Sequence, residues 1–355
     1  MIKFGKKSED ILDIKSSFIT ENAKLCEWQK ELYKIYSQQP KRKKCKNCEK
    51  KITGLKFKKL NISYILCKHC GHLNGEHDDT KILSKKFYQA YGQKNYSKIK
   101  IIYVENEKKD YSKRLKKIYI PKAKFLLDNL LKKEKNRNKI FNKFRYVDIG
   151  CGTGYFISSL KKLKIKNFSG YDPSKEMVVY GNKINKFNNL NFVEHDKTIN
   201  IIKNLDSSGP VCVSMIGSME HIYNQNEILK EIKKKKNIKY LFTSVPCFSP
   251  SSFIELVFDK NFQRVLAPQH THLYSEKSIK YLAKKLKFKI ISEWWFGGDI
   301  VDLYRNFILT IFPKKEINDG KTIFNEMFLK ILDSMQLGID KKKLSSEAHI
   351  LFKVN

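Results

Sequence analysis

The stretch "VDIGCGTG", residues 147–154, places an acidic residue and three glycines at the end of a short apolar run. Asp148 lies within that run, and Gly150, Gly152 and Gly154 follow in the turn that leads into a helical segment. Glycine is needed where a backbone bends sharply and a ligand must come close, because a Cβ atom would collide with it. The stretch therefore predicts a β-strand, a ligand-binding loop and an α-helix in succession.

The same alternation continues after the loop. Short apolar runs of strand length are separated by helical segments such as "YFISSLKKLK" (155–164) and "NEILKEIKKKK" (226–236). Strands that alternate with helices at this spacing build a parallel sheet with helices on both faces. We therefore expect an α/β, Rossmann-like fold with strands at 144–150, 167–172, 190–196, 210–217, 239–246 and 348–354.

A second carboxylate, Asp172, ends the next expected strand, 24 residues after Asp148. Sheets of this kind bind ligands in a crevice at the carboxyl ends of their strands, so Asp172 is expected beside the glycine loop. The dinucleotide pattern G-x-G-x-x-G is absent from the loop, and Asp148 would repel an anion. A ligand with an amino-acid ammonium and a sulfonium fits these charges better.

With these residues, and with "GYDPS" (170–174), "EHD" (194–196) and "SMEHI" (218–222), the chain resembles the class I S-adenosylmethionine-dependent methyltransferases over residues 110–300. In that family the glycine loop approaches the methionine part of the cofactor. The carboxylate after strand two holds the ribose hydroxyls, and one after strand three meets the adenine amino group. The resemblance implies S-adenosyl-L-methionine as cofactor, bound by Asp148, Gly150, Cys151, Gly152, Gly154, Asp172, Pro173 and Asp196.

Glu220 and His221 are the residues expected to contact the methyl acceptor. They follow expected strand four, so they should lie at the mouth of the crevice. Methyl transfer is an in-line displacement, so the enzyme must position the nucleophile and, for a hydroxyl or a carbon acid, remove its proton. His221 is the candidate general base, and Glu220 would orient it or contact the acceptor. The alternative is that the pair only caps the next helix.

Other acceptor classes carry motifs that this chain lacks. Amino-adenine methyltransferases have Asn/Asp-Pro-Pro-Tyr after strand four, where this chain has "GSMEH" (217–221). Cytosine-C5 enzymes need a nucleophilic cysteine there, but Cys247 follows strand five. Metal-binding O-methyltransferases of quinone pathways have a further Glu three residues before the Glu-His pair, where this chain has Gly217. These three enzyme classes are therefore disfavoured. Without the further Glu, a catalytic metal is disfavoured as well.

Four cysteines form the pattern C-x2-C-x18-C-x2-C. This spacing is typical of structural tetrathiolate zinc sites, and no secretory signal favours disulfides. The segment between the pairs alternates enough to form a β-hairpin, so we expect a zinc ribbon whose Zn²⁺ is bound by Cys45, Cys48, Cys67 and Cys70. Four thiolates close the coordination shell, so His69 and His72 are expected to take no part.

A cysteine zinc module before a methyltransferase core, with an addition after it, is similar to the sugar C-methyltransferases and to related enzymes of surface-polysaccharide clusters. That resemblance implies a small-molecule acceptor, in particular a nucleotide-linked sugar, served by the Glu-His pair. His270 or His272 would contact the acceptor from the loop after strand five. Asn74 and His77, at the end of the ribbon, would reach over it.

Composition and periodicity divide the chain into five expected parts. They are a helical N-terminal extension (1–40), the zinc ribbon (41–80), a helical connector and lid (81–136), the Rossmann-like core (137–300), and a helical cap with a final core strand (301–355).

The formal net charge of +35 comes from 71 Lys and Arg against 36 Asp and Glu. Only six of the 71 are Arg, and the excess of Lys is typical of a solvated surface rather than of phosphate recognition. The local exception is the segment 41–60, which has ten basic residues and one acidic, near the aromatic Phe57 and Tyr64. An RNA methyltransferase that grips RNA with the ribbon is therefore the alternative function.

The first residues, "MIKFGKKSED", lack an apolar signal region, and no stretch reaches the roughly 18 to 20 apolar residues of a membrane span. We therefore expect a cytoplasmic protein without a membrane partner. The sequence leaves the oligomeric state open.

Overall fold

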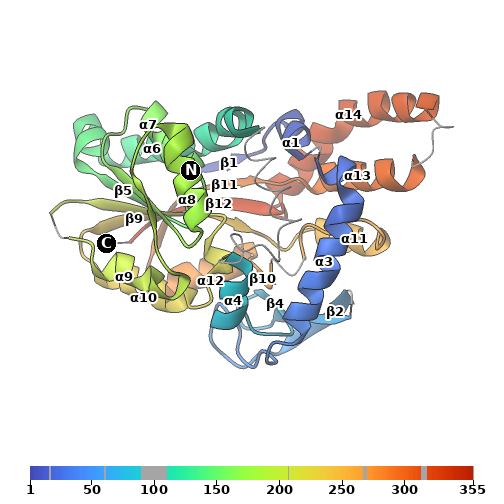
Figure 1. Ribbon diagram of the computed structural model, residues 1–355, viewed down its shortest axis with the longest axis horizontal. Coiled ribbons are helices and arrows are strands. Elements are labelled where there is room, and N and C mark those ends of the chain that lie inside the picture. The colour runs from blue at the N-terminus through green and yellow to red at the C-terminus, as the bar shows by residue number, and fades with distance from the viewer. Residues whose placement is uncertain are drawn as a thin grey trace.

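The computed structural model describes residues 1–15, 17–59, 61–88, 110–206, 208–266, 270–312 and 318–354. Its centre is an eight-stranded sheet with the order β1-β11-β12-β9-β8-β5-β6-β7 (Figure 1). These strands are β1 (Ile2–Phe4), β5 (Arg145–Ile149), β6 (Phe168–Asp172), β7 (Leu190–Phe192), β8 (Val211–Ile216), β9 (Ile238–Pro246), β11 (Lys289–Phe296) and β12 (Glu347–Lys353). The carboxyl ends of β5, β6 and β8, which carry the expected site residues, are therefore neighbours at one edge.

Strands β5 to β9 pair in parallel, whereas β12 runs antiparallel between β9 and β11. The inner strand β8 reads VCVSMI with its first five residues buried, the near-continuous apolar pattern of a strand covered on both faces. Each expected strand has a counterpart, although β7 ends at Phe192 instead of residue 196. The α/β, Rossmann-like fold expected from the sequence is confirmed.

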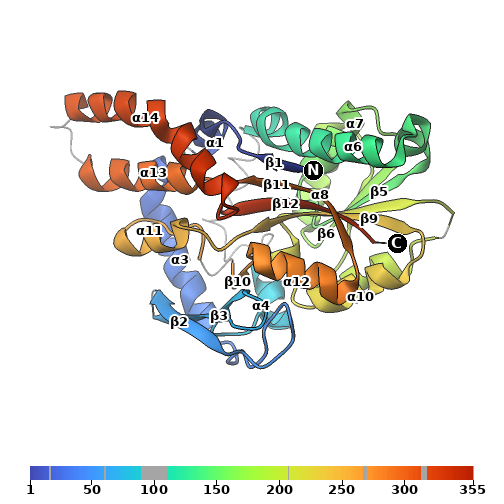
Figure 2. The same ribbon diagram turned by 180° about the vertical axis from the view of Figure 1, so that it is seen from behind.

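Helices cover both faces of the sheet, as Figures 1 and 2 show from opposite sides. On one face, α6 (Ile120–Glu134), α7 (Tyr155–Lys162) and α8 (Lys175–Asn185) bury Leu126, Phe156 and Val178 in one apolar cluster. On the other face, α9 (Thr198–Lys203), α10 (Gln225–Lys234) and α12 (Glu276–Leu286) bury Ile202, Ile228 and Ile279 in a second cluster. Shorter turns link these elements: the π-helical η3 (Leu115–Tyr119) and η4 (Lys139–Lys143), and the 3-10 turns η5 (His195–Lys197) and η6 (Met219–His221).

The chain begins with a strand that the sequence pattern did not predict. β1 pairs in parallel with β11, with Ile2 opposite Glu293, and so extends the sheet at its edge. Three residues are too few to show a two-residue periodicity, so only the long-range pairing reveals this strand. The expected N-terminal helices follow as α1 (Ser8–Lys15), α2 (Ser17–Thr20) and α3 (Asn22–Ser37).

The cysteine-rich segment forms a separate four-stranded sheet with the order β10-β4-β3-β2. Its strands are β2 (Gly54–Lys59), β3 (Ile62–Cys67), β4 (Leu73–Gly75) and β10 (His272–Leu273), and α4 (Lys81–Tyr88) follows it. β2 and β3 are the expected hairpin between the cysteine pairs. β10 comes from the segment after β9, so residues nearly 200 positions apart join one sheet, His272 opposite Asn74.

Three further helices lie beside the core: α11 (Ser251–Val257), α13 (Asp299–Ile311) and α14 (Asn318–Lys341). In Figures 1 and 2, α13 and α14 lie next to each other and extend past the end of the sheet. The proposed connector and lid, 81–136, includes residues 89–109, which lie outside the described residues. Among the described residues, no helix combines the length and apolar character that a membrane crossing requires.

Candidate active site

The glycine loop after β5 has the geometry that only glycine adopts easily. Gly150, Gly152 and Gly154 all have positive φ, at 74°, 54° and 79°. A Cβ on Gly150 would lie 2.4 Å from the Cβ of Ser218, whereas nothing lies within 4 Å of the corresponding position at Gly152. Gly150 therefore permits close packing, and Gly152 keeps open the space that a ligand would enter.

Two buried carboxylates face this loop. Asp172 accepts hydrogen bonds from the backbone N–H groups of Gly152, at 2.7 Å, and Ser174, at 2.8 Å. Asp148 accepts a hydrogen bond of 2.6 Å from the hydroxyl of Ser214 on β8. Burial raises the pKa of Asp148 to about 7 and that of Asp172 to about 6, against the opposing effect of these hydrogen bonds. A cationic ligand would restore the charged form of both carboxyls.

A cavity of about 420 Å³ opens from this loop, within the range of small-molecule sites. One group of lining residues comes from the carboxyl ends of the parallel strands and the helices after them: Asp148, Gly150, Cys151, Gly152, Thr153, Asp172, Pro173, Met177 and His195. A second group comes from the N-terminal helices and the segment after α11: Phe18, Leu25, Trp28, Phe262, Arg264 and His270.

The second group makes a largely apolar wall. The ring centroid of Phe262 lies 5.6 Å from that of Phe18 and 6.3 Å from that of Trp28. The guanidinium of Arg264 lines the same wall but is neutralised by the buried carboxylate of Asp302, which accepts hydrogen bonds from its Nε and Nη2. This wall would bind the body of an acceptor and keep water away from it.

Glu220, His221 and His270 meet at the junction of the two groups. The carboxylate Oε1 of Glu220 lies 3.7 Å from Nε2 of His221, and the rings of His221 and His270 are stacked with centroids 5.3 Å apart. Burial raises the pKa of Glu220 to about 8, and burial together with Arg264 lowers the pKa of His270 to about 4. An acid and a neutral imidazole therefore stand beside His221, where a proton could be exchanged with an acceptor.

A family model described as "Methyltransferase domain" matches residues 111–293, more than half of the 355 residues. The chain belongs to this methyltransferase-domain family. The matched range starts before η3 and ends within β11, so it holds the whole glycine loop and the Glu220–His221 pair. The enzyme class expected from the sequence, an S-adenosylmethionine-dependent methyltransferase, is confirmed.

Solved structures resemble this methyltransferase in fold. The plantazolicin methyltransferase BamL, in complex with a triazolic desmethylPZN analog and SAH, is 14% identical, covers 77% of this chain and 95% of its own, and has a TM-score of 0.46. Geranyl diphosphate C-methyltransferase from Streptomyces coelicolor A3(2) is 13% identical, covers 75% of this chain and 87% of its own, and has a TM-score of 0.43. A SAM dependent methyltransferase from Archaeoglobus fulgidus is 19% identical, covers 64% of this chain and 93% of its own, and has a TM-score of 0.38. No curated protein matches the chain.

Most residues expected to bind the cofactor line the cavity: Asp148, Gly150, Cys151, Gly152, Asp172 and Pro173. Two do not. A Cβ on Gly154 would lie 2.7 Å from Leu190, so this glycine serves the packing of α7 against β7. Asp196 forms an ion pair of 2.6 Å with Lys81 on α4, and its neighbour His195 lines the cavity instead.

The residues expected to contact substrate from the ribbon and the later loop lie elsewhere. Asn74 is fully buried and serves the cysteine cluster: its Oδ1 accepts from the N–H of Lys46 at 2.9 Å, and its Nδ2 donates to Cys45 Sγ at 3.4 Å. His77 Nδ1 lies 2.6 Å from the carbonyl of Gln39, and the buried His272 lies 2.9 Å from His72. None of the three lines the cavity, so the expectation of substrate contact is corrected.

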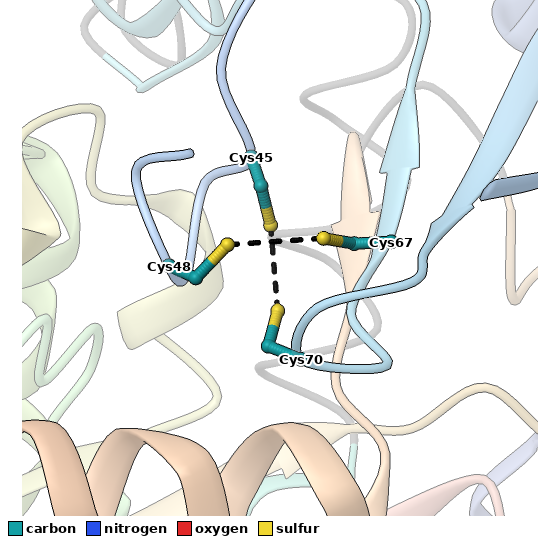
Figure 3. Close-up of side chains that lie close together, drawn as sticks. All are labelled: Cys45, Cys48, Cys67 and Cys70. Atoms are coloured by element: carbon teal, nitrogen blue, oxygen red, sulfur yellow. Dashed lines mark hydrogen bonds between the residues drawn. The ribbon is translucent and has the colours of Figure 1, made fainter. Parts of the chain in front are cut away.

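The four ribbon cysteines are buried and converge on one point, as Figure 3 shows. The sulfurs of Cys45 and Cys70 are 3.6 Å apart, and those of Cys48 and Cys67 are 3.7 Å apart. A tetrahedron with Zn–S bonds of about 2.3 Å has sulfurs about 3.8 Å apart, so the cluster fits Zn²⁺. The expected donors are thus brought together, and His72 is turned away toward His272.

The sequence did not reveal the cavity wall that α2 and α3 contribute. It also did not show which of His270 and His272 lines the cavity. The histidines in "APQHTHLYS" (267–275) were recognised together, but nothing in that stretch shows that His270 faces the cavity and His272 faces the small sheet. One sequence feature could have identified Arg264 as a site residue, because arginine is scarce in this chain. No sequence feature identifies the aromatic wall, because Trp28 and Phe262 are far apart in the chain and meet only in the folded protein.

Proposed function

We propose that this methyltransferase transfers a methyl group from S-adenosyl-L-methionine to a small molecule bound against the wall of Phe18, Trp28 and Phe262. The observation that carries the proposal is a cavity whose lining includes the glycine loop, this wall and His221. A cavity of about 420 Å³ suits a small acceptor beside a cofactor better than a folded polymer.

The residues at the loop fit the cofactor. Gly152 leaves space for its methionine part, and the carboxylate of Asp172 offers acceptors for hydroxyl groups. When bound, S-adenosyl-L-methionine supplies an electrophilic methyl carbon, and the electron pair of the broken carbon–sulfur bond leaves with sulfur. The charges of Asp148 and Asp172 would hold a cationic ligand in place.

On the acceptor side, His221 is the residue proposed to take the proton of the attacking group. Its neighbour Glu220 is 3% exposed, and the carboxylate Oε1 lies 3.7 Å from His221 Nε2. A small closure on binding the acceptor would form the hydrogen bond that orients a base. The aromatic wall excludes water and so protects the reaction from a competing acceptor.

The finer proposal for the acceptor is a nucleotide-linked sugar of a surface-polysaccharide or secondary-metabolite route. It is supported by the sequence plan of cysteine module, methyltransferase core and C-terminal addition. Arg114 and Arg264 also line the cavity, and arginine suits a pyrophosphate, although Asp302 already neutralises Arg264.

The alternative of an RNA substrate gripped by the ribbon receives no support from the ribbon's own contacts. Of the ten basic residues in 41–60, Arg42 and Lys46 pair with Asp79, and Lys59 is fully buried against Glu255. Tyr64 is buried, and Phe57 stacks on it at 5.5 Å. These groups stabilise the ribbon, whereas the other seven basic residues of the segment are exposed, so RNA is included in the test below.

A direct test incubates the full-length protein with S-adenosyl-L-methionine and one acceptor at a time: nucleotide-linked sugars, free sugars, phenolic compounds and RNA. S-adenosylhomocysteine and the methylated product are measured by mass spectrometry. We expect turnover with a small molecule, and first with a nucleotide-linked sugar. Turnover with RNA and with none of the small molecules would overturn the proposal.

A further inference from the structure

Glu220, His221 and His270 have the composition and spacing of a metal-binding site. One ligand atom from each, the carboxylate oxygen and a nitrogen of each imidazole, lies within 4.8 Å of the other two. Two histidines and one carboxylate are the ligand set of catalytic zinc sites and of non-haem iron sites. We propose that these three residues hold a divalent transition-metal cation at the acceptor end of the cavity.

His270 is oriented as a metal ligand would be. Its Nδ1 lies 3.1 Å from the carbonyl oxygen of Val265, which can only accept, so Nδ1 carries the hydrogen. The lone pair is therefore on Nε2, the nitrogen left for a cation. Metal-bound histidines almost always donate their other ring N–H to a carbonyl or carboxylate in this way.

Glu220 supplies an independent sign that a ligand is needed. Its side chain is 3% exposed, and among the described residues its Oε2 has no hydrogen-bond partner. A buried oxygen left unpaired is costly, and such groups are rare in folded proteins. A cation between Glu220 and the two histidines would satisfy this oxygen.

The site is open on one side, unlike the four-cysteine cluster. Gly217 lines the same cavity, and nothing lies within 4 Å of the position that its Cβ would occupy. Three protein ligands leave coordination positions for water or for the acceptor, which is the pattern of a catalytic metal site. Gly217, in place of the Glu of quinone-pathway O-methyltransferases, disfavoured a catalytic metal in the sequence. The fold adds a ligand that the sequence did not show, because His270, 49 residues after His221, lies beside Glu220 and His221.

This inference rests on the proposed function and changes one part of it, because His221 becomes a ligand instead of the base. It also restricts the methyl acceptor to a molecule that is methylated on oxygen, such as the hydroxyl of a sugar or of a phenol. A bound cation would lower the pKa of that hydroxyl, whose proton would leave to a water molecule at an open coordination position. The oxygen would then form the bond to the methyl carbon as the carbon–sulfur bond of the cofactor breaks and its electron pair leaves with sulfur. Arg264, the nearby cation, is neutralised by Asp302 and leaves the site available.

The test titrates Mn²⁺ into the full-length protein carrying its purified content of zinc, and follows free Mn²⁺ by electron paramagnetic resonance. Mn²⁺ prefers carboxylate and imidazole to thiolate, so the cysteine cluster does not compete. We expect one bound Mn²⁺ per chain in the wild type and at least about tenfold weaker binding in Glu220→Gln and His270→Ala. His69→Ala, which changes an exposed histidine of the ribbon, should bind as the wild type does.

Two results would overturn the inference. One is a wild type that binds no Mn²⁺, Co²⁺ or Zn²⁺ beyond the metal of the cysteines, and the other is equal Mn²⁺ affinity in the wild type and both variants.

Calorimetry with S-adenosylhomocysteine on the same samples distinguishes failure of the metal site from failure of the proposed function. Cofactor binding without a second metal refutes only the cation site, whereas a wild type that binds no cofactor refutes the proposed function. Circular dichroism checks that each variant is folded, and Glu220→Gln keeps the shape of the native side chain.

Discussion

The carboxylate of Asp172, at the end of β6, accepts a hydrogen bond of 2.7 Å from the backbone N–H of Gly152, in the loop after β5. This bond ties the acidic residue of one strand to the glycine loop of its neighbour. Both parts of the proposed cofactor site are therefore held in place before a ligand binds, which lowers the ordering cost of binding.

The buried carboxyls predict how stability depends on pH. An unfolded Asp titrates at a pKa of about 3.9, but Asp148 and Asp172 have pKa values of about 7 and about 6 in the folded chain. Between pH 4 and pH 7 the folded protein therefore binds more protons, and the contribution of these groups to the free energy of unfolding falls as pH rises. Buried histidines with a lowered pKa, such as His270, change stability in the opposite direction, so the wild type must be compared with a variant. Urea unfolding of cofactor-free wild type and Asp148→Asn gives the free energy of unfolding at pH 5 and at pH 8. The value at pH 5 minus the value at pH 8 should be smaller in Asp148→Asn, and an equal or larger difference in that variant would contradict the assignment.

Replacement of His221 should affect turnover and leave cofactor binding nearly unchanged. His221→Ala removes the residue proposed to serve the acceptor, so we expect turnover to fall by ~10² to 10⁴, the range of a lost general base. The rate of S-adenosylhomocysteine formation measures turnover, and calorimetry measures cofactor affinity. His69→Ala is the control. Unchanged turnover in His221→Ala would reduce this residue to a helix cap.

The cysteine cluster should hold one zinc ion per chain. Cys67→Ser removes one of four converging thiolates, so metal analysis should show the loss of about one equivalent of zinc. Cys26→Ser is the matched control, because Cys26 lies outside the cluster and is not fully buried. Equal zinc content in purified Cys67→Ser and Cys26→Ser would refute the four-thiolate site.

A buried ion pair connects the small sheet to the segment that follows α11. The Lys59 ammonium donates to Glu255 Oε2 at 2.7 Å, and Glu255 Oε1 accepts from the backbone N–H of Arg264 at 2.6 Å. Both side chains are at most 1% exposed. Glu255→Ala leaves a buried charge unpaired and should lower the free energy of unfolding by about 3 to 5 kcal/mol.

Denaturant unfolding measures this loss. The control is Glu49→Ala, because the Glu49 side chain is 42% exposed and its partners Lys230 and Lys285 are 51% and 19% exposed. It should change stability by less than about 1 kcal/mol. Similar losses in the two variants would show that Lys59 and Glu255 do not stabilise the fold as described.

The core was predictable because its signals are local. The strand before "VDIGCGTG", the glycines and Asp172 follow from periodicity and from the needs of a tight turn. The spacing within and between the cysteine pairs indicates by itself that the four cysteines bind one zinc ion. These features require no knowledge of which distant segments meet.

What the sequence did not predict depends on long-range contacts. β1 is recognisable only beside β11, and the wall of Trp28 and Phe262 joins residues more than 200 positions apart. The assignment of His272 to the site was wrong because β10 pairs with β4 and turns that side chain into the small sheet. His270, two residues earlier, lies on the cavity side.

Cofactor affinity in wild type and Asp172→Asn tests the central claim most directly. Calorimetry with S-adenosyl-L-methionine and the full-length protein should show one bound cofactor per chain. Asp172→Asn should weaken that binding by at least about tenfold, since hydrogen bonds to a charged group contribute about 1.5 to 3 kcal/mol. Circular dichroism should show the same fold in both proteins. A folded wild type that binds no cofactor, or equal affinity in the two proteins, would contradict the account.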